Sequence, residues 1–236
     1  MVRLAPFILI FFSLVLTACD QKPDKTPPNI LFIAVDDLRP ELNCFGADHI
    51  ISPNIDEVAG NGIIFRQAYC QVPVCGASRA SLLTGIRPNV SRFIDYDTWA
   101  DIDAPGIISL PAHFKANGYH TISNGKIFHH KTDKIDSWSV PPWVPADDIV
   151  GKKYWRDYQK KENIEIMERN DGAGPAYENA DVDDNAYFDG KIAFRSIQDL
   201  KKLKDMGKPF FLAVGFYKPH LPFNVPKKYW ELYDPE

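Results

Sequence analysis

The sequence is poor in cysteine and has no block of basic residues. Its four cysteines are spread over 236 residues, and the pair Cys70 and Cys75 is followed by no second pair, which argues against a zinc site. Disulfides between Cys70 and Cys75, or between Cys44 and Cys70, stay open. A formal net charge of −4 without a basic run indicates no nucleic-acid partner. Internal repeats and low-complexity tracts are also absent, and 45% hydrophobic residues can form a substantial core, so disorder is not expected.

The apolar run near the N-terminus is too short to span a bilayer comfortably. It extends over Phe7–Leu16 and follows Arg3, a pattern typical of a signal peptide. The run ends in Leu16-Thr17-Ala18-Cys19, which resembles a bacterial lipobox, where the cysteine becomes the lipidated N-terminus. We therefore expect residues 1–19 to be a lipoprotein signal peptide, with a plain signal peptide cut after Ala18 as the alternative. Residues 20–28 contain three prolines and predict a tether, so the expected location is the periplasm or cell surface, anchored to a membrane through the lipid on Cys19.

Strand and helix patterns alternate over residues 29–236, which predicts an α/β layer structure with a largely parallel sheet. Continuous apolar runs at residues 29–35 and 209–216 are typical of strands buried on both faces. Residues 119–123 predict a further strand and residues 63–65 a short one. Helices are expected at about 52–59, 75–83, 109–117 and 184–206. The last of these helices has an approximate apolar face formed by Ile192, Phe194, Ile197, Leu200 and Leu203. Residues 133–181 show little periodicity and are interpreted as a loop-rich insertion.

Polar side chains follow each predicted long strand. Asp36 and Asp37 follow the first, Lys126 and His129 follow the second, and His220 follows the last. Because open α/β sheets place their sites at the carboxyl ends of the strands, we expect these groups to converge. Adjacent carboxylates are hard oxygen ligands suited to Ca²⁺ or Mg²⁺. The alternative for this pair is a turn cap beside a solvated carboxylate.

Cys75 is predicted at the N-terminus of a helix, with Arg79 one turn further on. A thiol held by a helix N-terminus and a guanidinium suits chemistry on an anion, whereas a buried structural thiol is the alternative. A cysteine phosphatase is excluded because its loop needs an arginine six residues after the cysteine, and position 81 is serine.

The run from Cys75 to Gly85 resembles the type I sulfatases, whose motif is Cys-x-Pro-Ser-Arg, with Ala77 at the proline position. Further resemblances to the sulfatase core lie at residues 29–37, 52–56 and 62–65, and resemblances to its iduronate-2-sulfatase branch lie at residues 125–129, 137–139 and 217–223. The resemblance implies an alkaline-phosphatase-like, three-layer α/β/α fold with a mostly parallel central sheet. Family members carry further metal ligands and a lysine beyond the point that matches Glu236, so it also implies a C-terminally incomplete domain.

The resemblance implies a role for each candidate residue. Cys75 would be oxidised to formylglycine by the formylglycine-generating enzyme, and the hydrated aldehyde would attack the sulfur of a sulfate ester. Asp36, Asp37 and residue 75 would bind Ca²⁺, with Mg²⁺ as the alternative. The remaining roles are distributed as follows: Arg79 would hold the diol, Lys126 would clamp a sulfate oxygen, His129 would hydrogen-bond the formylglycine or sulfate, and His220 would face the leaving-group oxygen.

The function expected from these residues is hydrolysis of sulfate esters on a sulfated carbohydrate, of the iduronate-2-sulfatase type. Two alternatives stay open. One is a phosphomonoester or phosphonate hydrolase, because that class shares the superfamily fold. The other is a truncated, non-catalytic glycan-binding lipoprotein, in which Cys75 is unmodified.

Overall fold

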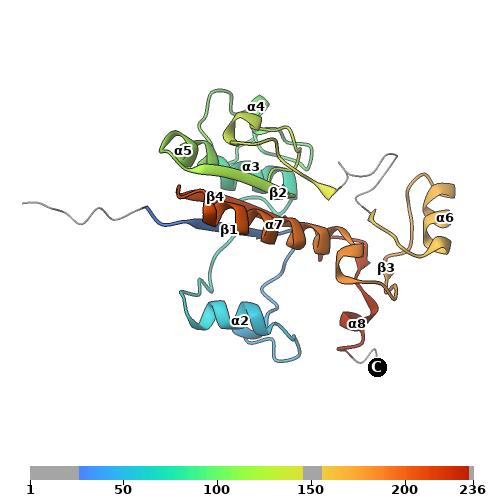
Figure 1. The fold of residues 1–236 in the computed structure, drawn as a ribbon. Helices are drawn as coiled ribbons and strands as arrows, with labels where there is room; N and C mark the ends of the chain where they lie inside the picture. The colour runs from blue at the N-terminus through green and yellow to red at the C-terminus, as the bar shows by residue number, and fades with distance from the viewer. Residues whose placement is uncertain (1–26, 146–155, 234–236) are drawn as a thin grey trace, which may run out of the picture.

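The centre of the fold is a parallel sheet of three strands in the order β1-β4-β2 (Figure 1). A computed structural model describes residues 27–145 and 156–233, so the predicted signal peptide and lipobox lie outside the described residues. Strand β1 covers Ile30–Val35, β2 covers His120–Gly125 and β4 covers Phe210–Phe216. Since β4 pairs in parallel with both neighbours, the carboxyl ends of all three strands lie at one edge.

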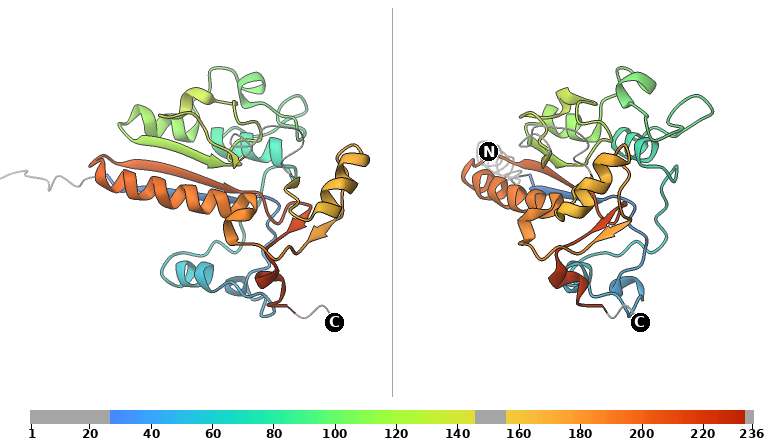
Figure 2. Two further views of the ribbon diagram at one scale, coloured as in Figure 1. Left: turned by 45° about the vertical axis from the view of Figure 1, so that its right-hand side comes forward. Right: turned by 90° about the vertical axis from the view of Figure 1, so that its right-hand side faces the viewer.

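Helices cover both faces of this sheet, which confirms the predicted three-layer arrangement (Figure 2). Helices α3 (Cys75–Thr84) and α5 (Leu110–Ala116) lie on one face, and α7 (Phe188–Asp205) lies on the other. The side chains of β4 alternate between the two layers: Phe211 and Ala213 join the core with α3, whereas Leu212 and its even-numbered neighbours pack against α7. Strand β4 is thus buried on both faces, as predicted.

Strand β1 differs from the prediction, because one of its faces is open. Leu31 is 48% exposed and Ile33 is 54% exposed. Helix α7 packs chiefly over β4 and β2, and in the described part of the chain β1 pairs only with β4. The apolar run therefore forms an edge strand rather than a strand buried on both faces.

The predicted helices form, with shifted ends. Helix α2 (Pro53–Gly60) buries none of its residues, and it lies apart from the sheet on the β1 side (Figure 1). At α5 the Ser109 hydroxyl caps the helix by accepting from the amide of Ala112 at 3.2 Å. Helix α7 begins later than predicted, after a 3-10 turn η5 (Asp184–Ala186). Two residues of its predicted apolar face, Phe194 and Ile197, are exposed rather than buried.

The segment interpreted as a loop-rich insertion contains more regular structure than predicted. It holds the 3-10 turn η2 (Ile135–Ser137), helix α6 (Lys161–Arg169) and strand β3 (Tyr177–Glu178), which pairs in parallel with β5 (Phe223–Asn224). The buried carboxylate of Glu178 organises this segment by accepting from Tyr187 and from three donors on residues 159, 160 and 163. The short strand predicted at residues 63–65 is wrong, since these residues are irregular.

The remaining elements are short, and they are η1 (Asn43–Phe45), α4 (Ala100–Asp103) and α8 (Lys227–Trp230). Cys44, Cys70 and Cys75 are all free thiols, so neither disulfide left open by the sequence is present. Among the residues that the structure describes, no helix is both long and apolar enough to cross a membrane.

Candidate active site

The candidate site lies where the three strands end. The loops after β2 and β4 and the first turn of α3 enclose a pocket of about 480 Å³. It is lined by Cys75, Tyr96, Lys126, His129, Tyr217 and His220. Of the five residues predicted to converge because they follow strands, Lys126, His129 and His220 line this pocket, together with the candidate Cys75. Asp36 contacts Lys126 and Asp37 lies near His220.

Cys75 lies at the first position of α3, after Val74, which has an extended backbone. Its Sγ is 3.3 Å from Nδ1 of His129. Burial, assisted by the positive charge of Lys126 and by His130, lowers the pKa of His129 to about 4. His129 is therefore neutral at neutral pH, and one of its ring nitrogens can accept a proton.

Asp36 connects the other two charged candidates below the pocket. Its carboxylate is 3% exposed and accepts from Nη2 of Arg79 at 2.9 Å and from Nζ of Lys126 at 2.5 Å. Burial by itself raises the pKa of Asp36, but the charges of Arg79 and Lys126 outweigh it and hold the pKa below its ordinary value. Arg79 also donates through Nη1 to the backbone carbonyls of Lys126 and Ile127. It thereby joins α3 to the ends of β1 and β2.

Asp37 and His220 face each other across the mouth of the site. The backbone of Asp37 is left-handed, with a φ of 57°, and its side chain is 57% exposed. Its Oδ2 is 4.0 Å from Nε2 of His220. The other ring nitrogen of His220, Nδ1, is 2.7 Å from the carbonyl oxygen of Leu221. Because a carbonyl only accepts, Nδ1 carries the proton, and in the neutral ring Nε2 is the unprotonated nitrogen.

The described residues supply only part of a Ca²⁺ site. The two carboxylates of Asp36 and Asp37 are of the right chemistry, but Ca²⁺ takes six to eight oxygen ligands. Within residues 27–145 and 156–233 no group of three or more His, Cys, Asp or Glu side chains is arranged to hold a metal ion. Asp36 already accepts from two cationic side chains. A cation at this place therefore has to share Asp36 with Arg79 and Lys126 and find further ligands.

Some residues of the site were not predicted from the sequence. Tyr96 lies in a segment without a motif, whereas Tyr217 opens the run at residues 217–223 that resembles the sulfatase family. Membership of that run is the only feature of the sequence that points to Tyr217 as a site residue. His130 received no predicted role, and its ring stacks on Trp99 with centroids 3.9 Å apart. This contact is structural.

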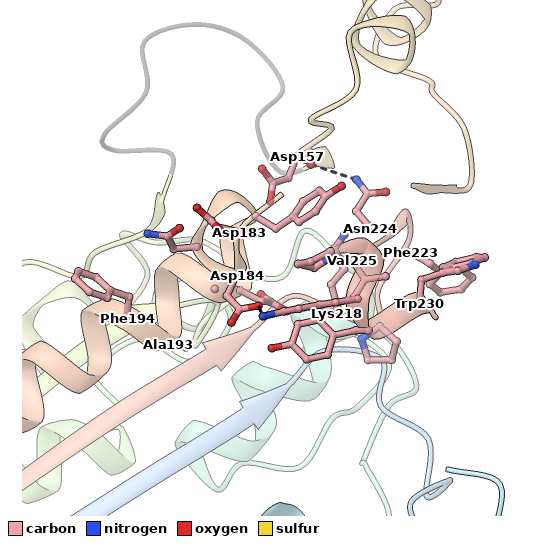
Figure 3. A pocket seen from close by; sticks show the side chains of 18 of the residues that line it. Asp157, Asp183, Asp184, Ala193, Phe194, Lys218, Phe223, Asn224, Val225 and Trp230 are labelled. Atoms are coloured by element: carbon pink, nitrogen blue, oxygen red, sulfur yellow. Dashed lines mark hydrogen bonds and ion pairs between the residues drawn. The ribbon is translucent and has the colours of Figure 1, made fainter. Parts of the chain in front are cut away.

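A larger cavity of about 860 Å³ adjoins the site, and the loop after β4 lines both cavities. Figure 3 shows the larger cavity, with Asp157, Lys218 and Asn224 among its lining side chains. Burial raises the pKa of Asp157 to about 7. Tyr217 and His220 line the pocket of Cys75, whereas Lys218 lines this second cavity, so the loop presents different residues to each side.

Comparisons with known proteins agree on one family. The sulfatase family model matches residues 28–235. Iduronate 2-sulfatase from Homo sapiens is 39% identical over 216 residues, which cover 87% of this chain and 37% of that protein. A sulfatase from Formosa agariphila is 30% identical over an alignment of 255 residues, covering 96% of this chain and 46% of that protein. The chain thus spans less than half the length of these two curated relatives.

Solved structures with the same architecture share low sequence identity with this chain. The phosphonate monoester hydrolase of Agrobacterium radiobacter superposes with a TM-score of 0.63 at 20% identity, covering 89% of this chain and 44% of that one. A protein of the alkaline phosphatase superfamily from Vibrio parahaemolyticus gives a TM-score of 0.59 at 17% identity, covering 89% and 45%. These likenesses show the alkaline-phosphatase-superfamily fold. The match of the sulfatase family model over residues 28–235 shows that the chain belongs to the sulfatase family.

Proposed function

We propose that this chain carries the nucleophile side of an active site that hydrolyses sulfate esters of a carbohydrate. The observation that supports it most is the meeting of Cys75, Lys126, His129 and His220 in one pocket, within a chain of the sulfatase family. The similarity to iduronate 2-sulfatase favours a sulfated uronic acid as the substrate. A phosphate or phosphonate ester is the second candidate, supported by the superposition on a phosphonate monoester hydrolase.

In this proposal Cys75 is the precursor of formylglycine. A formylglycine-generating enzyme would carry out a two-electron oxidation at Cβ, with an external oxidant such as molecular oxygen accepting the electron pair. A C=O bond would replace the C–S bond, and the sulfur would leave as hydrogen sulfide. Position 75 would hold this aldehyde group, whose hydrated form would offer one hydroxyl as the nucleophile toward sulfur and a second for release of the sulfate. The proximity of His129 Nδ1, 3.3 Å from Sγ of Cys75, puts a neutral imidazole beside this group. His129 can therefore accept a hydrogen bond from a hydroxyl at position 75, and its lowered pKa makes it a weak base for that proton.

Lys126 and Arg79 give the site its affinity for an anion. With Asp36 they form a buried group of two positive charges and one negative charge, so a net positive charge lies beneath the pocket. Lys126 lines the pocket and is the cation of this group that can reach a sulfate oxygen. Arg79 is held by Asp36 and by two backbone carbonyls, so its charge is fixed in place without reorganisation.

His220 is placed to meet the oxygen of the leaving group. Its Nδ1 proton is committed to the Leu221 carbonyl, so a proton is given from Nε2 only when the ring is charged. The carboxylate of Asp37 lies nearby, with Oδ2 at 4.0 Å from Nε2. Asp36 and Asp37 would also hold Ca²⁺ or Mg²⁺, and the bound cation would offset the charge of the sulfate.

Mass spectrometry of position 75 tests the proposal. In protein purified from its own host, the tryptic peptide of residues 67–79 is expected to carry an aldehyde in place of the thiol. The preparation should turn over an aryl sulfate faster than the matching aryl phosphate. A thiol alone, with glycan binding but no turnover, would favour the non-catalytic alternative. Preference for the phosphate would favour the second candidate function, and Cys75→Ala is the control that must lose either activity.

We also propose that the chain is exported and anchored through a lipid on Cys19, which the Leu16–Cys19 motif supports. Cells fed a clickable fatty acid should label the wild-type protein and leave Cys19→Ala unlabelled. A mature protein that begins after Ala18 and carries no lipid would instead indicate a plain signal peptide.

A further inference from the structure

The loop that carries His220 is folded back on a single lysine side chain. Nζ of Lys218 donates to the carbonyl of His220 at 3.2 Å and to the carbonyl of Pro222 at 2.6 Å. The carbonyl between these two, that of Leu221, accepts from Nδ1 of His220 at 2.7 Å. Three successive carbonyls are thus divided between Lys218 and the imidazole. Because Lys218 donates to the carbonyls of His220 and Pro222, the carbonyl of Leu221 between them accepts from the ring of His220.

The start of the same loop is fixed by helix α7. Asp189, in the first turn of α7, accepts from the backbone amide of Tyr217 at 2.8 Å through Oδ1 and from that of Lys218 at 2.9 Å through Oδ2. Each oxygen of the carboxylate therefore holds one amide. Burial raises the pKa of Asp189 and lowers that of Lys218, while the opposite charge of each favours the ionised form of the other. Asp189 thus holds the start of the loop through two backbone amides, and Lys218 holds its later part through two backbone carbonyls.

We propose that Lys218 is a positioning residue for His220, and that Asp189 anchors the segment from which Lys218 acts. The proposal rests on the proposed function in one respect, namely that Nε2 of His220 meets the leaving group. Lys218 lines the larger cavity shown in Figure 3, whereas His220 lines the pocket of Cys75. Lys218 therefore acts on His220 through the backbone carbonyls and the loop, and not by touching a sulfate in the pocket.

The expected effect of losing Lys218 is a change in the state of His220. In Lys218→Met the two outer carbonyls lose their charged donor, so the loop relaxes and Leu221 no longer offers a fixed acceptor to Nδ1. The neutral ring then populates both tautomers. In a preparation active on an aryl sulfate, kcat should fall about 10- to 100-fold with KM nearly unchanged, because proton transfer is lost while anion binding is kept.

Ring NMR of ¹⁵N-histidine protein tests the positioning role directly in the full chain. The chain has six histidines, and His220→Gln assigns the signal of His220. At a pH well above the ordinary histidine pKa of about 6.5, the wild-type ring is expected in the single Nδ1–H tautomer. Inorganic sulfate, the probe, should shift the signals of both His129 and His220. Lys218→Met should show mixed tautomers at His220 and lose its response to sulfate, while His129 still responds.

Three further variants separate positioning from general damage. Lys228→Met is the matched control, because Lys228 lines the same cavity and pairs with Asp184 at 2.7 Å on the surface. It should leave both histidines unchanged. Lys218→Arg keeps a charged donor and should restore the single tautomer. Asp189→Asn keeps one acceptor oxygen, so it should loosen the same loop even if Lys218→Met fails to fold.

One outcome would overturn the positioning role of Lys218, and another would overturn only the proposed anion site. A single Nδ1–H tautomer and an unchanged sulfate response in both Lys218→Met and Asp189→Asn would overturn the positioning role. If the wild-type histidines ignore sulfate but Lys218→Met still mixes the tautomers of His220, positioning stands and the proposed anion site fails.

Discussion

Replacement of Asp36 by asparagine is the most informative perturbation of this molecule. The substitution conserves shape but leaves the buried cations Arg79 and Lys126 without their counter-charge. The amide retains one acceptor oxygen and presents an NH₂ group to the other cation. Breaking a buried ion pair by neutralising one partner costs about 3–5 kcal/mol, because the remaining charge is buried without compensation. We expect a loss of this size, since Asp36 is 3% exposed.

Urea unfolding followed by tryptophan fluorescence measures this loss. With an m-value of about 2 kcal/mol/M, the midpoint should fall by about 1.5–2.5 M in Asp36→Asn. Asp37→Asn is the matched control because its side chain is 57% exposed, and it should change stability by less than about 0.5 kcal/mol. Equal midpoints for Asp36→Asn and Asp37→Asn would refute the reasoning that Asp36 holds the strand ends together electrostatically.

The pH dependence of the stability difference between wild type and Asp36→Asn gives a second test of this ion pair. The charges of Arg79 and Lys126 overcome the effect of burial and lower the folded-state pKa of Asp36 below the ordinary 3.8. A lowered pKa means that the contribution of Asp36 is fully present above pH 3.8 and is lost as the pH falls through the folded-state pKa. The stability gap between wild type and Asp36→Asn should therefore be constant at neutral pH and narrow below pH 3.8. A gap that widens there would contradict the assignment.

Three other predictions follow from named groups. The pKa of His129 is lowered to about 4, so between pH 6.5 and 4 the unfolded chain binds a proton that the folded chain does not. This difference lowers the free energy of unfolding as the pH falls. Replacement of the residue in His129→Gln should therefore make stability depend less on pH in this range, as measured by unfolding curves at a series of pH values. Calcium should raise the melting temperature of wild type by mass action, and Asp36→Asn should abolish that increase in scanning fluorimetry; an equal increase in both would place the cation elsewhere. Glu178→Gln should cost about 2–3 kcal/mol and expose the amides of α6 to hydrogen exchange before those of β4. The reason is that three of the four donors to this carboxylate lie at the start of α6, on residues 159, 160 and 163, and the fourth is Tyr187; uniform exchange would count against this.

Local patterns predicted the elements that pack on both sides of β4. Continuous apolar runs mark strands, and the helix start at Ser109 and the stop at Gly118 follow from side-chain capping and a left-handed glycine. The same run in β1 could not reveal that Leu31 and Ile33 are exposed, since periodicity records hydrophobicity and not whether a helix covers that face of the strand. Helix α6 was not predicted although its residues are spaced amphipathically, with residues 163, 164, 166 and 167 half-buried on one side. It is short and lies within a segment that was interpreted as aperiodic.

The sequence predicted most of the residues of the candidate site but only part of the contacts between them. Residues that follow parallel strands converge for topological reasons, which is why Lys126, His129 and His220 share a pocket. Cys75 joins them from the first position of helix α3. The sequence could not show that Arg79 and Lys126 pair with one buried carboxylate, because the three residues lie far apart in the chain. The roles of Lys218 and Asp189 could not be predicted from the sequence for a different reason. They act on backbone amides and carbonyls, which every residue has and no motif records.

The buried group around Asp36 is compatible with the proposed binding of both a metal cation and an anionic ester. A carboxylate has about four lone-pair positions, and Arg79 and Lys126 occupy two of those on Asp36. Lone pairs therefore remain for a metal cation without the loss of either contact. Such a cation would add positive charge beside Lys126, where charges in a buried environment interact strongly. Asp37 would offset part of that charge, and an anion in the adjoining pocket would offset the rest. The cation and the sulfate ester are thus expected to favour each other's binding through Asp36, while His129 and His220, which face the same pocket, remain available for proton transfer.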